Sequence, residues 1–121
     1  MSQKFVPHRA PIIGVYSDYI SITTSTTLTT TGLKFTATEP GLYRVTASAL
    51  FSSTKPTQLR INQSYTGTSW YNLIDERSTE NTSALTGTAI YRLETGGGFE
   101  LLVAYSSASS NYVGMIVEKI G

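Results

Sequence analysis

The clearest structural signal in this chain lies in residues Leu28–Ala47, LTTTGLKFTATEPGLYRVTA. This stretch combines a strand, a tight turn and the start of a second strand. After Gly41 the odd positions as far as Phe51 are apolar, and polar residues such as Arg44 occupy most positions between them. A period of two over nine residues predicts a β-strand with one face in a core.

The turn before this strand has suitable residues. Pro40 fixes its own φ and Gly41 tolerates a positive φ, so the pair suits the two central positions of a type II turn. Tyr43 then re-enters the sheet, where we expect its ring to cover the open end of a sandwich while its hydroxyl stays near water. The same pattern would also suit a hairpin of another β-sandwich.

Composition favours one all-β domain. The chain has 121 residues, which is enough for one core and too few for two. Thr, Tyr and Val are abundant, and no window has helical periodicity. The net charge of +1 argues against nucleic acid as a general partner. The chain contains no apolar run near 18 residues, so no membrane insertion is expected.

The absence of cysteine bears on the compartment in which the protein is made. A small secreted domain often carries a disulfide, whereas this chain has no cysteine. Its N-terminal residues, MSQKFVPHRAP, are polar and do not form a secretory signal. We therefore expect synthesis in a reducing cytoplasm, whether the protein stays there or leaves in a particle.

Residues 1–11 are predicted to form an extended basic arm, followed by a single domain over residues 12–121. Pro7 and Pro11 exclude a regular helix. We expect the arm to pack against its own domain, a neighbouring subunit or a larger assembly. Its candidate attachment residues are Lys4, Phe5, Val6, His8 and Arg9.

Further strands are predicted along the chain. Residues 12–22 are interpreted as a first strand pair, and the Thr-rich residues 23–31 as a solvated turn or edge strand. The charged run DERSTEN, residues 75–81, is interpreted as a loop. Later alternating segments predict strands over residues 57–62, 85–93, 99–105 and 112–120.

Several of these residues resemble a family signature. Phe35, followed after five residues by Gly41-x-Tyr43-x-Val45-x-Ala47, is similar to the signature of the complement C1q globular-head family, a branch of the tumour necrosis factor (TNF) superfamily. The ending Tyr112–Val117 resembles the family's terminal strand. The resemblance implies an antiparallel jelly-roll β-sandwich (TNF-like) of eight to ten strands that forms a homotrimer.

Two segments are apolar on both sides, namely residues 101–104 and 113–117. Strands buried on both faces lack alternation, so the second face is predicted to meet another subunit. The sequence alone supports only an oligomer, and the trimer comes from the resemblance. The candidate interface residues are Leu102, Tyr112, Gly114 and Ile116.

No catalytic or metal-binding motif is found, so neither enzymatic activity nor a cofactor is expected. The chain has one His, no Cys and only two Asp. A calcium ion would require the fold to gather Asp18, Asp75, Glu76 and Glu80, and nothing in their spacing demands it.

One loop has the composition of a binding site. Its candidate ligand residues are Tyr65, Trp70, Tyr71 and Asn72. Aromatic rings beside amides suit sugar faces and protein hot spots. The alternative is that these rings complete the core or the subunit interface.

These features lead to a functional hypothesis. The protein is interpreted as a non-enzymatic virion structural protein, a trimeric knob that decorates or cements the capsid of a bacteriophage or forms its fibre tip. Its partners would then be capsid or fibre proteins. The alternative is a trimeric module that binds a host-surface glycan or receptor through the Tyr65/Trp70/Tyr71 loop. A bacterial cytoplasmic protein of unknown role is a third possibility.

Overall fold

The computed structural model describes residues 13–79 and 83–121, which form eight antiparallel strands in two sheets. In chain order the strands are β1 (Ile13–Thr23), β2 (Thr29–Thr36), β3 (Gly41–Leu50), β4 (Pro56–Ser64), β5 (Tyr71–Arg77), β6 (Ala84–Leu93), β7 (Gly98–Tyr105) and β8 (Ser110–Lys119). This part of the chain contains no helix long and apolar enough to cross a membrane. The predicted all-β fold with eight to ten strands is confirmed.

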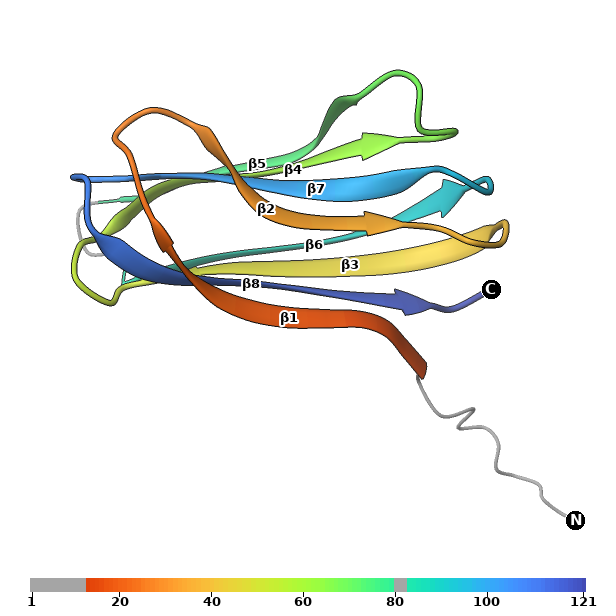
Figure 1. Cartoon of the computed structure of the whole chain (residues 1–121), viewed down its shortest axis with the longest axis horizontal. Coiled ribbons are helices and arrows are strands. Elements are labelled where there is room, and N and C mark those ends of the chain that lie inside the picture. Colours follow the sequence, from red (N-terminus) through yellow and green to blue (C-terminus); the bar gives the residue numbers. More distant parts are fainter. Residues whose placement is uncertain (1–12, 80–82) are drawn as a thin grey trace, which may run out of the picture.

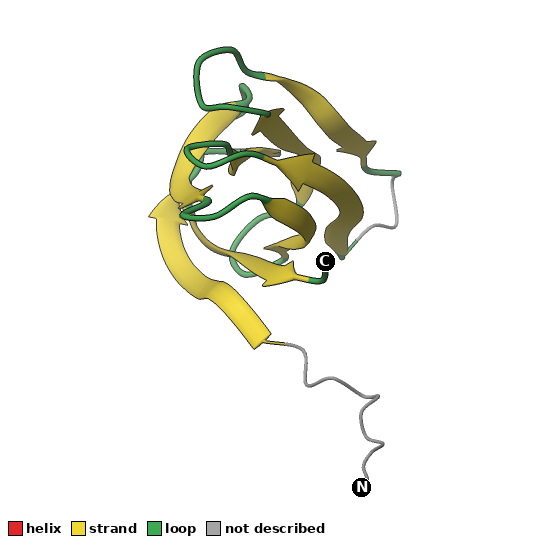
Figure 2. Cartoon of the chain, turned by 90° about the vertical axis from the view of Figure 1, so that its right-hand side faces the viewer, coloured by secondary structure: helices red, strands yellow, loops and turns green. Residues whose placement is uncertain are grey.

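The two sheets lie face to face as the layers of a sandwich (Figure 1). One sheet has the order β1-β8-β3-β6, and the other has the order β2-β7-β4-β5. Most neighbours within a sheet are therefore distant in sequence, as in a jelly roll. Turns from both sheets meet at one end of the sandwich, which faces the viewer in Figure 2.

The core lies between the inward faces of the two sheets. On β3 the predicted inward residues from Tyr43 to Ala49 are buried, and on β4 the predicted pair Leu59 and Ile61 is fully buried. Phe35 of β2 lies 5.4 Å from the Tyr43 ring and 6.3 Å from the Phe99 ring, so both layers share an aromatic cluster. Each fully buried large apolar side chain stabilises the fold by about 1.5–3 kcal/mol.

A buried amide joins three loops at the other end of the sandwich. Asn111 is fully buried at the start of β8. Its Nδ2 donates to Thr24 Oγ1 at 3.1 Å and to Thr54 Oγ1 at 2.9 Å. Its Oδ1 accepts from the backbone N–H groups of Ser53 and Thr54. All the polar atoms of this amide are paired, which makes burial tolerable.

The structure corrects the predicted strand boundaries in two places. Residues 12–22 are not a strand pair, because β1 runs unbroken from Ile13 to Thr23 with one irregularity between Gly14 and Tyr16. The run 75–81 is not wholly a loop, because β5 extends to Arg77. On each of these edge strands an exposed acid interrupts the apolar alternation on the inward side: Asp18 of β1 is aligned with Met115, and Glu76 of β5 is aligned with Leu59.

Two details of the central hairpin also differ from expectation. A type II turn needs a positive φ at its second central residue, and among the described residues only Gly32, Gly67 and Gly96 have one, so Gly41 does not serve that role. A Cβ at Gly41 would instead meet the Lys119 side chain and the Gly121 carbonyl. Phe51 was predicted inward, but it follows the end of β3 and is 49% exposed.

Candidate functional site

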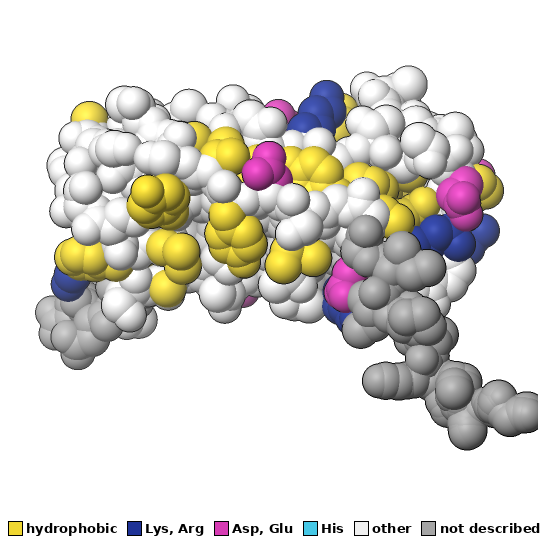
Figure 3. All heavy atoms as spheres, turned by 60° about the horizontal axis from the view of Figure 1, so that its bottom comes forward, with side chains coloured by type: hydrophobic (Ala, Val, Ile, Leu, Met, Phe, Trp, Pro, Cys, Tyr) yellow, Lys and Arg dark blue, Asp and Glu magenta, His cyan; other side chains and the backbone are white. Residues whose placement is uncertain are grey.

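The outward side of sheet β1-β8-β3-β6, here called the β8 face, carries exposed apolar side chains. Strand alternation directs every second residue away from the core. Tyr19, Ile90 and Tyr112 point outward and are 51%, 53% and 54% exposed. Figure 3 shows apolar side chains in a band across the side of the molecule that carries β1 and β8. Large apolar groups gathered on one face are typical of an interaction surface.

Gly114 lies in the middle of this face, on β8. It is aligned with Tyr19 on β1 and with Ser48 on β3. A Cβ on Gly114 would collide with the Tyr19 ring, so that ring covers the position of the missing side chain. The lack of a side chain at Gly114 therefore leaves room for the Tyr19 ring over β8.

Polar groups between the apolar ones are paired. Arg44 Nε donates to Glu118 Oε1 at 2.9 Å, and both side chains are partly buried. Thr88 Oγ1 donates to Thr46 Oγ1 at 3.3 Å across two strands. If another subunit covered the β8 face, these four side chains would still be hydrogen-bonded to one another within the chain.

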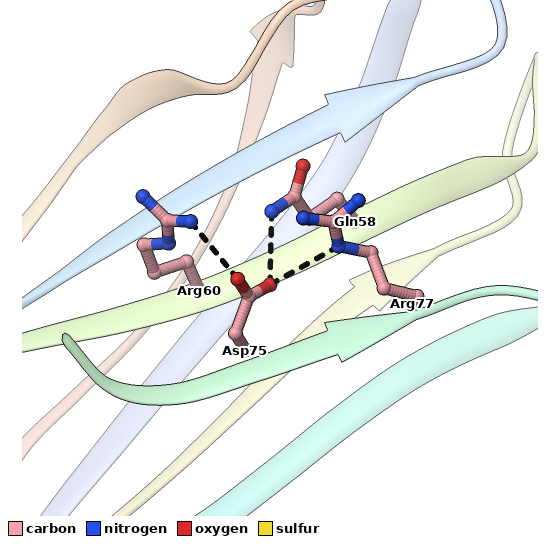
Figure 4. Close-up of polar contacts among 4 residues, drawn as sticks. All are labelled: Gln58, Arg60, Asp75 and Arg77. Atoms are coloured by element: carbon pink, nitrogen blue, oxygen red, sulfur yellow. Dashed lines mark hydrogen bonds and ion pairs between the residues drawn. The ribbon is translucent and has the colours of Figure 1, made fainter.

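The outward side of sheet β2-β7-β4-β5, here called the β4 face, is dominated by a charged network (Figure 4). Asp75 of β5 accepts hydrogen bonds from Arg60 Nη2 and from Gln58 Nε2, each at 2.9 Å. Arg77 Nε lies 3.5 Å from the same carboxylate. The hydrogen bond from Arg60 is the main cause that lowers the pKa of Asp75 from its ordinary value, with Gln58 acting in the same direction.

Trp70 and Lys34 extend the β4 face beside this network. The Lys34 ammonium lies 5.0 Å from the centre of the Trp70 ring, a cation–π contact. Lys34 is aligned with Glu100 on β7, and Glu100 is aligned with Asn62 on β4. Trp70 is half-buried just before β5. It therefore belongs to the sheet surface rather than to an exposed loop tip.

The other three residues of the predicted ligand loop do not share one environment. Tyr65 Oη donates to Glu94 Oε2 at 2.9 Å, which raises the pKa of Tyr65. Tyr71 is 64% exposed, and Asn72 beside it is also exposed. The four candidate residues are thus neighbours in sequence, but Trp70 and Tyr65 have separate partners.

The predicted interface residues are divided between the two faces. Tyr112, Gly114 and Ile116 all lie on the β8 face, whereas Leu102 lies on β7 in the other sheet, aligned with Arg60. Leu102 and Ile116 are half-buried within a single chain. One flat interface cannot include both faces of the sandwich, so the structure does not bring Leu102 together with the other three.

The remaining candidates are either dispersed or lie outside the described residues. The attachment residues Lys4, Phe5, Val6, His8 and Arg9 fall outside residues 13–79 and 83–121, as does Glu80. Asp18 is on β1 and Asp75 is on β5, which belong to different sheets. Within the described ranges no group of three metal-ligating side chains occurs.

Sequence reasoning missed Tyr19 and the network around Arg60. In the sequence Tyr19 is only part of an alternating segment, because its position over Gly114 depends on the pairing of β1 with β8. Arg60 and Asp75 are 15 residues apart and become neighbours through the β4–β5 register. No local motif encodes such cross-strand pairs.

No known protein-family model matches the sequence, and no curated protein matches it. Solved structures do resemble it. The globular domain of zebrafish complement 1qA protein is 19% identical, with a TM-score of 0.52 over 73% of this chain and 69% of that chain. Murine APRIL at pH 8.0 is 12% identical, with a TM-score of 0.53 over 77% of this chain and 74% of that chain. The chain therefore has the jelly-roll fold of complement C1q and TNF-like globular domains, as its sequence signature implied.

Proposed function

We propose that this protein is a non-enzymatic structural module that works as a homotrimer, with the β8 face as its subunit interface. The observation that carries the proposal is the exposure of Tyr19, Tyr112 and Ile90 on that face. Covering such rings in a subunit contact removes apolar area from water and provides the main favourable free energy of association.

The β4 face is a poorer candidate for the same contact. Its outward side chains include Arg60, Asp75 and Arg77, whose ion pairs are partly solvated. Removing charged groups from water costs free energy that their pairing does not fully return. Interface cores are depleted of charged residues. The β8 face carries the ion pair of Arg44 with Glu118, whereas the β4 face carries the larger network around Asp75, so the comparison favours the β8 face.

The cysteine-free chain allows a direct test of this choice. Thr88→Cys places a thiol on the β8 face, and Thr30→Cys places a matched thiol on the β4 face; both residues are exposed in the single chain. The proposal predicts slow maleimide labelling at position 88 and fast labelling at position 30, with equal rates in denaturant. Equal rates in the native protein would contradict it.

We further propose that the trimer is part of a bacteriophage virion. It would serve there either as a capsid decoration or cement protein or as a fibre tip. Two sequence features support it: the absence of cysteine, and the basic arm with Lys4 and Arg9. A basic segment binds an acidic surface by charge complementarity, and the arm is expected to attach to the particle in this way. Deleting residues 1–11 is expected to abolish binding to the parent particle, and unchanged binding would contradict an attachment role.

A second candidate function is recognition of a receptor or carbohydrate. The observation that favours it is the exposure of Tyr71 and Asn72, which lie on β5 rather than in the sheet of the β8 face. A trimer built on the β8 face would leave them free. A glycan array read with the wild type and with Tyr71→Ala tests this role, since an exposed ring that binds sugar should lose its signal when truncated.

A further inference from the structure

The four edge strands of the sandwich differ in how regular they are. β1 and β6 form the edges of one sheet, and β2 and β5 form the edges of the other. The ladders of β1, β2 and β5 are each interrupted by a register shift, whereas the ladder of β6 with β3 is regular over ten aligned pairs. An irregular edge is a poor template for another strand, and a regular edge is a good one.

Charged side chains make the same distinction. Exposed acids lie on the inward side of β1 at Asp18 and of β5 at Glu76, and β2 carries Lys34. Inward-pointing charges and lysines are means by which proteins prevent unwanted pairing at an edge. β6 has one charged residue, Arg92, next to its last position. Of the four edge strands that the structure describes, only β6 is both regular and uncharged over most of its length.

The register shows which main-chain groups lie on the free side of β6. Phe51 N–H donates to Ser83 O at 3.0 Å, directly beyond the aligned ends of β3 and β6. Because hydrogen-bonded and non-hydrogen-bonded pairs alternate in an antiparallel ladder, the main chains of Thr86, Thr88 and Ile90 point away from β3. Among the described residues, these three make no main-chain hydrogen bond outside the β3–β6 ladder. Their N–H and C=O groups are therefore available to another strand.

The opposite sheet closes the sandwich beneath β6 without pairing its edge. A Cβ on Gly87 would meet Ile74 Cγ2 at 3.0 Å and Leu59 Cδ2 at 3.4 Å, so side chains of β4 and β5 reach β6 from the core side. Ala89 and Tyr91 also point inward, but they are only half-buried. An added strand would cover these two side chains and extend the core sideways.

We propose that the free edge of β6 binds an extended, largely uncharged peptide of a partner protein, which adds to the sheet as an antiparallel strand. A row of unpaired N–H and C=O groups is matched by the main chain of another strand, which selects a peptide rather than a small ligand. Apolar β-branched residues of the peptide would pack against Ala89 and Tyr91. An acid opposite Arg92, whose side chain is 60% exposed, would complement the only charge on β6.

This binding site is separate from the subunit contact proposed above. The subunit contact covers the outward side of the β8 face, whereas the peptide lies beside β6 in the plane of the sheet. The competing occupant is β6 of a second copy, because a strand edge can also pair with itself about a two-fold axis. Such self-pairing would join two trimers, so the mass of the protein separates the two cases.

The probe is the synthetic peptide Glu-Val-Thr-Val-Thr-Val-Thr. In the antiparallel register its Glu lies opposite Arg92, and its Val residues lie on the side of Ala89. The control peptide has the same side chains but carries N-methyl groups on its Thr residues, which removes the donors that face β6.

Amide hydrogen exchange, followed by NMR on the full chain, measures the two states of the edge. In the free protein we expect fast exchange at Thr86, Thr88 and Ile90 and slow exchange at Gly87 and Ala89, which alternate with them. The probe should slow exchange at the first three residues. The methylated control should leave it unchanged.

Two substitutions test the same edge through the affinity of a fluorescent form of the probe. Thr86→Pro removes an N–H that points to the free side, where a strand tolerates proline, and should weaken binding at least about tenfold. The matched control Thr86→Val keeps the N–H and should bind as the wild type does. Ala89→Glu gives β6 the inward charge that β5 carries at Glu76, and should also weaken binding at least about tenfold.

Other results would overturn the proposal and name a different role for the edge. Slow exchange at Thr86, Thr88 and Ile90 in the free protein would assign the edge to a second trimer if the mass is six chains, and to the subunit contact if it is three. Failure of the probe to bind, or equal binding of both peptides, would show that β6 accepts no added strand. A wild-type mass of one chain with normal binding of the probe would contradict the trimer and leave the peptide site standing.

Discussion

The Tyr19 ring lies over Gly114 and fills the space that a side chain on residue 114 would need. The two residues are directly aligned on β1 and β8, in the middle of the β8 face. Tyr19 remains 51% exposed, so the ring offers its outer side to solvent or to a partner. The absence of a Cβ on β8 therefore makes room for the aromatic surface that β1 presents.

Gly114→Ala is expected to displace the Tyr19 ring without unfolding the domain. The ring can rotate into solvent, and Ala restricts the unfolded backbone more than Gly, so the free energy of unfolding should change by less than about 1 kcal/mol. Displacing this aromatic surface should raise the dissociation constant of the oligomer at least about tenfold, measured by sedimentation equilibrium.

A double-mutant cycle with Tyr19→Ala provides the control for this prediction. If the ring transmits the effect, Gly114→Ala should cost little further affinity once Tyr19 has been truncated. Additive losses from the two substitutions would show that Gly114 acts in some other way.

Asn111→Ala is expected to lower the free energy of unfolding by about 3–5 kcal/mol. The substitution leaves the N–H groups of Ser53 and Thr54 without their acceptor and opens a cavity at a fully buried position. The exposed Asn72→Ala is the matched control and should change stability by less than about 0.5 kcal/mol. Urea denaturation measures the free energy of unfolding of both variants. Similarly small losses in Asn111→Ala and Asn72→Ala would contradict the claim that Asn111 holds the three loops together.

Tyr105 is expected to make the fold sensitive to alkali. Its hydroxyl donates to Leu50 O at 2.7 Å, and burial raises its pKa from 10.0 to about 12. A tyrosine with a raised pKa stabilises the fold in its neutral form, so that contribution is complete below about pH 10 and is lost as the pH rises through about 12.

Urea denaturation at pH 8 and at pH 11.5 tests this dependence. Tyr105→Phe should be less stable than the wild type at pH 8, because it lacks the hydrogen bond, and should lose less stability at high pH. The exposed Tyr71→Phe serves as control. An alkaline loss of equal size in the wild type and Tyr105→Phe would assign the effect to other groups.

The sequence predicted the core better than the surfaces, for a physical reason. Alternation along β3 reports burial directly, and Tyr43, Val45 and Ala47 are indeed buried. An apolar run such as residues 101–104 shows that both sides of a strand are covered, but not by what. The sequence pattern therefore predicts the same interface for Leu102 and Ile116, and only the strand order separates them.

Local sequence patterns also do not predict turns or networks that join neighbouring strands. The Pro40-Gly41 pair suited a type II turn by propensity, yet Gly41 begins β3 and is small because Lys119 and Gly121 approach it. The charged run predicts a loop at Asp75, whereas the register with Arg60 places this residue in β5. Contacts of this kind depend on the register of a whole sheet.

The most direct test of the central claim is the mass of the protein in dilute solution, measured by light scattering at micromolar concentration. The chain weighs 13.1 kDa, and the account predicts a wild-type mass of three chains. Tyr112→Glu places a charge in the β8 face and should reduce the mass to one chain, while Tyr71→Glu on β5 should leave it at three. A wild-type mass of one or two chains, or a Tyr112→Glu variant that still has the mass of three, would contradict the trimer built on the β8 face.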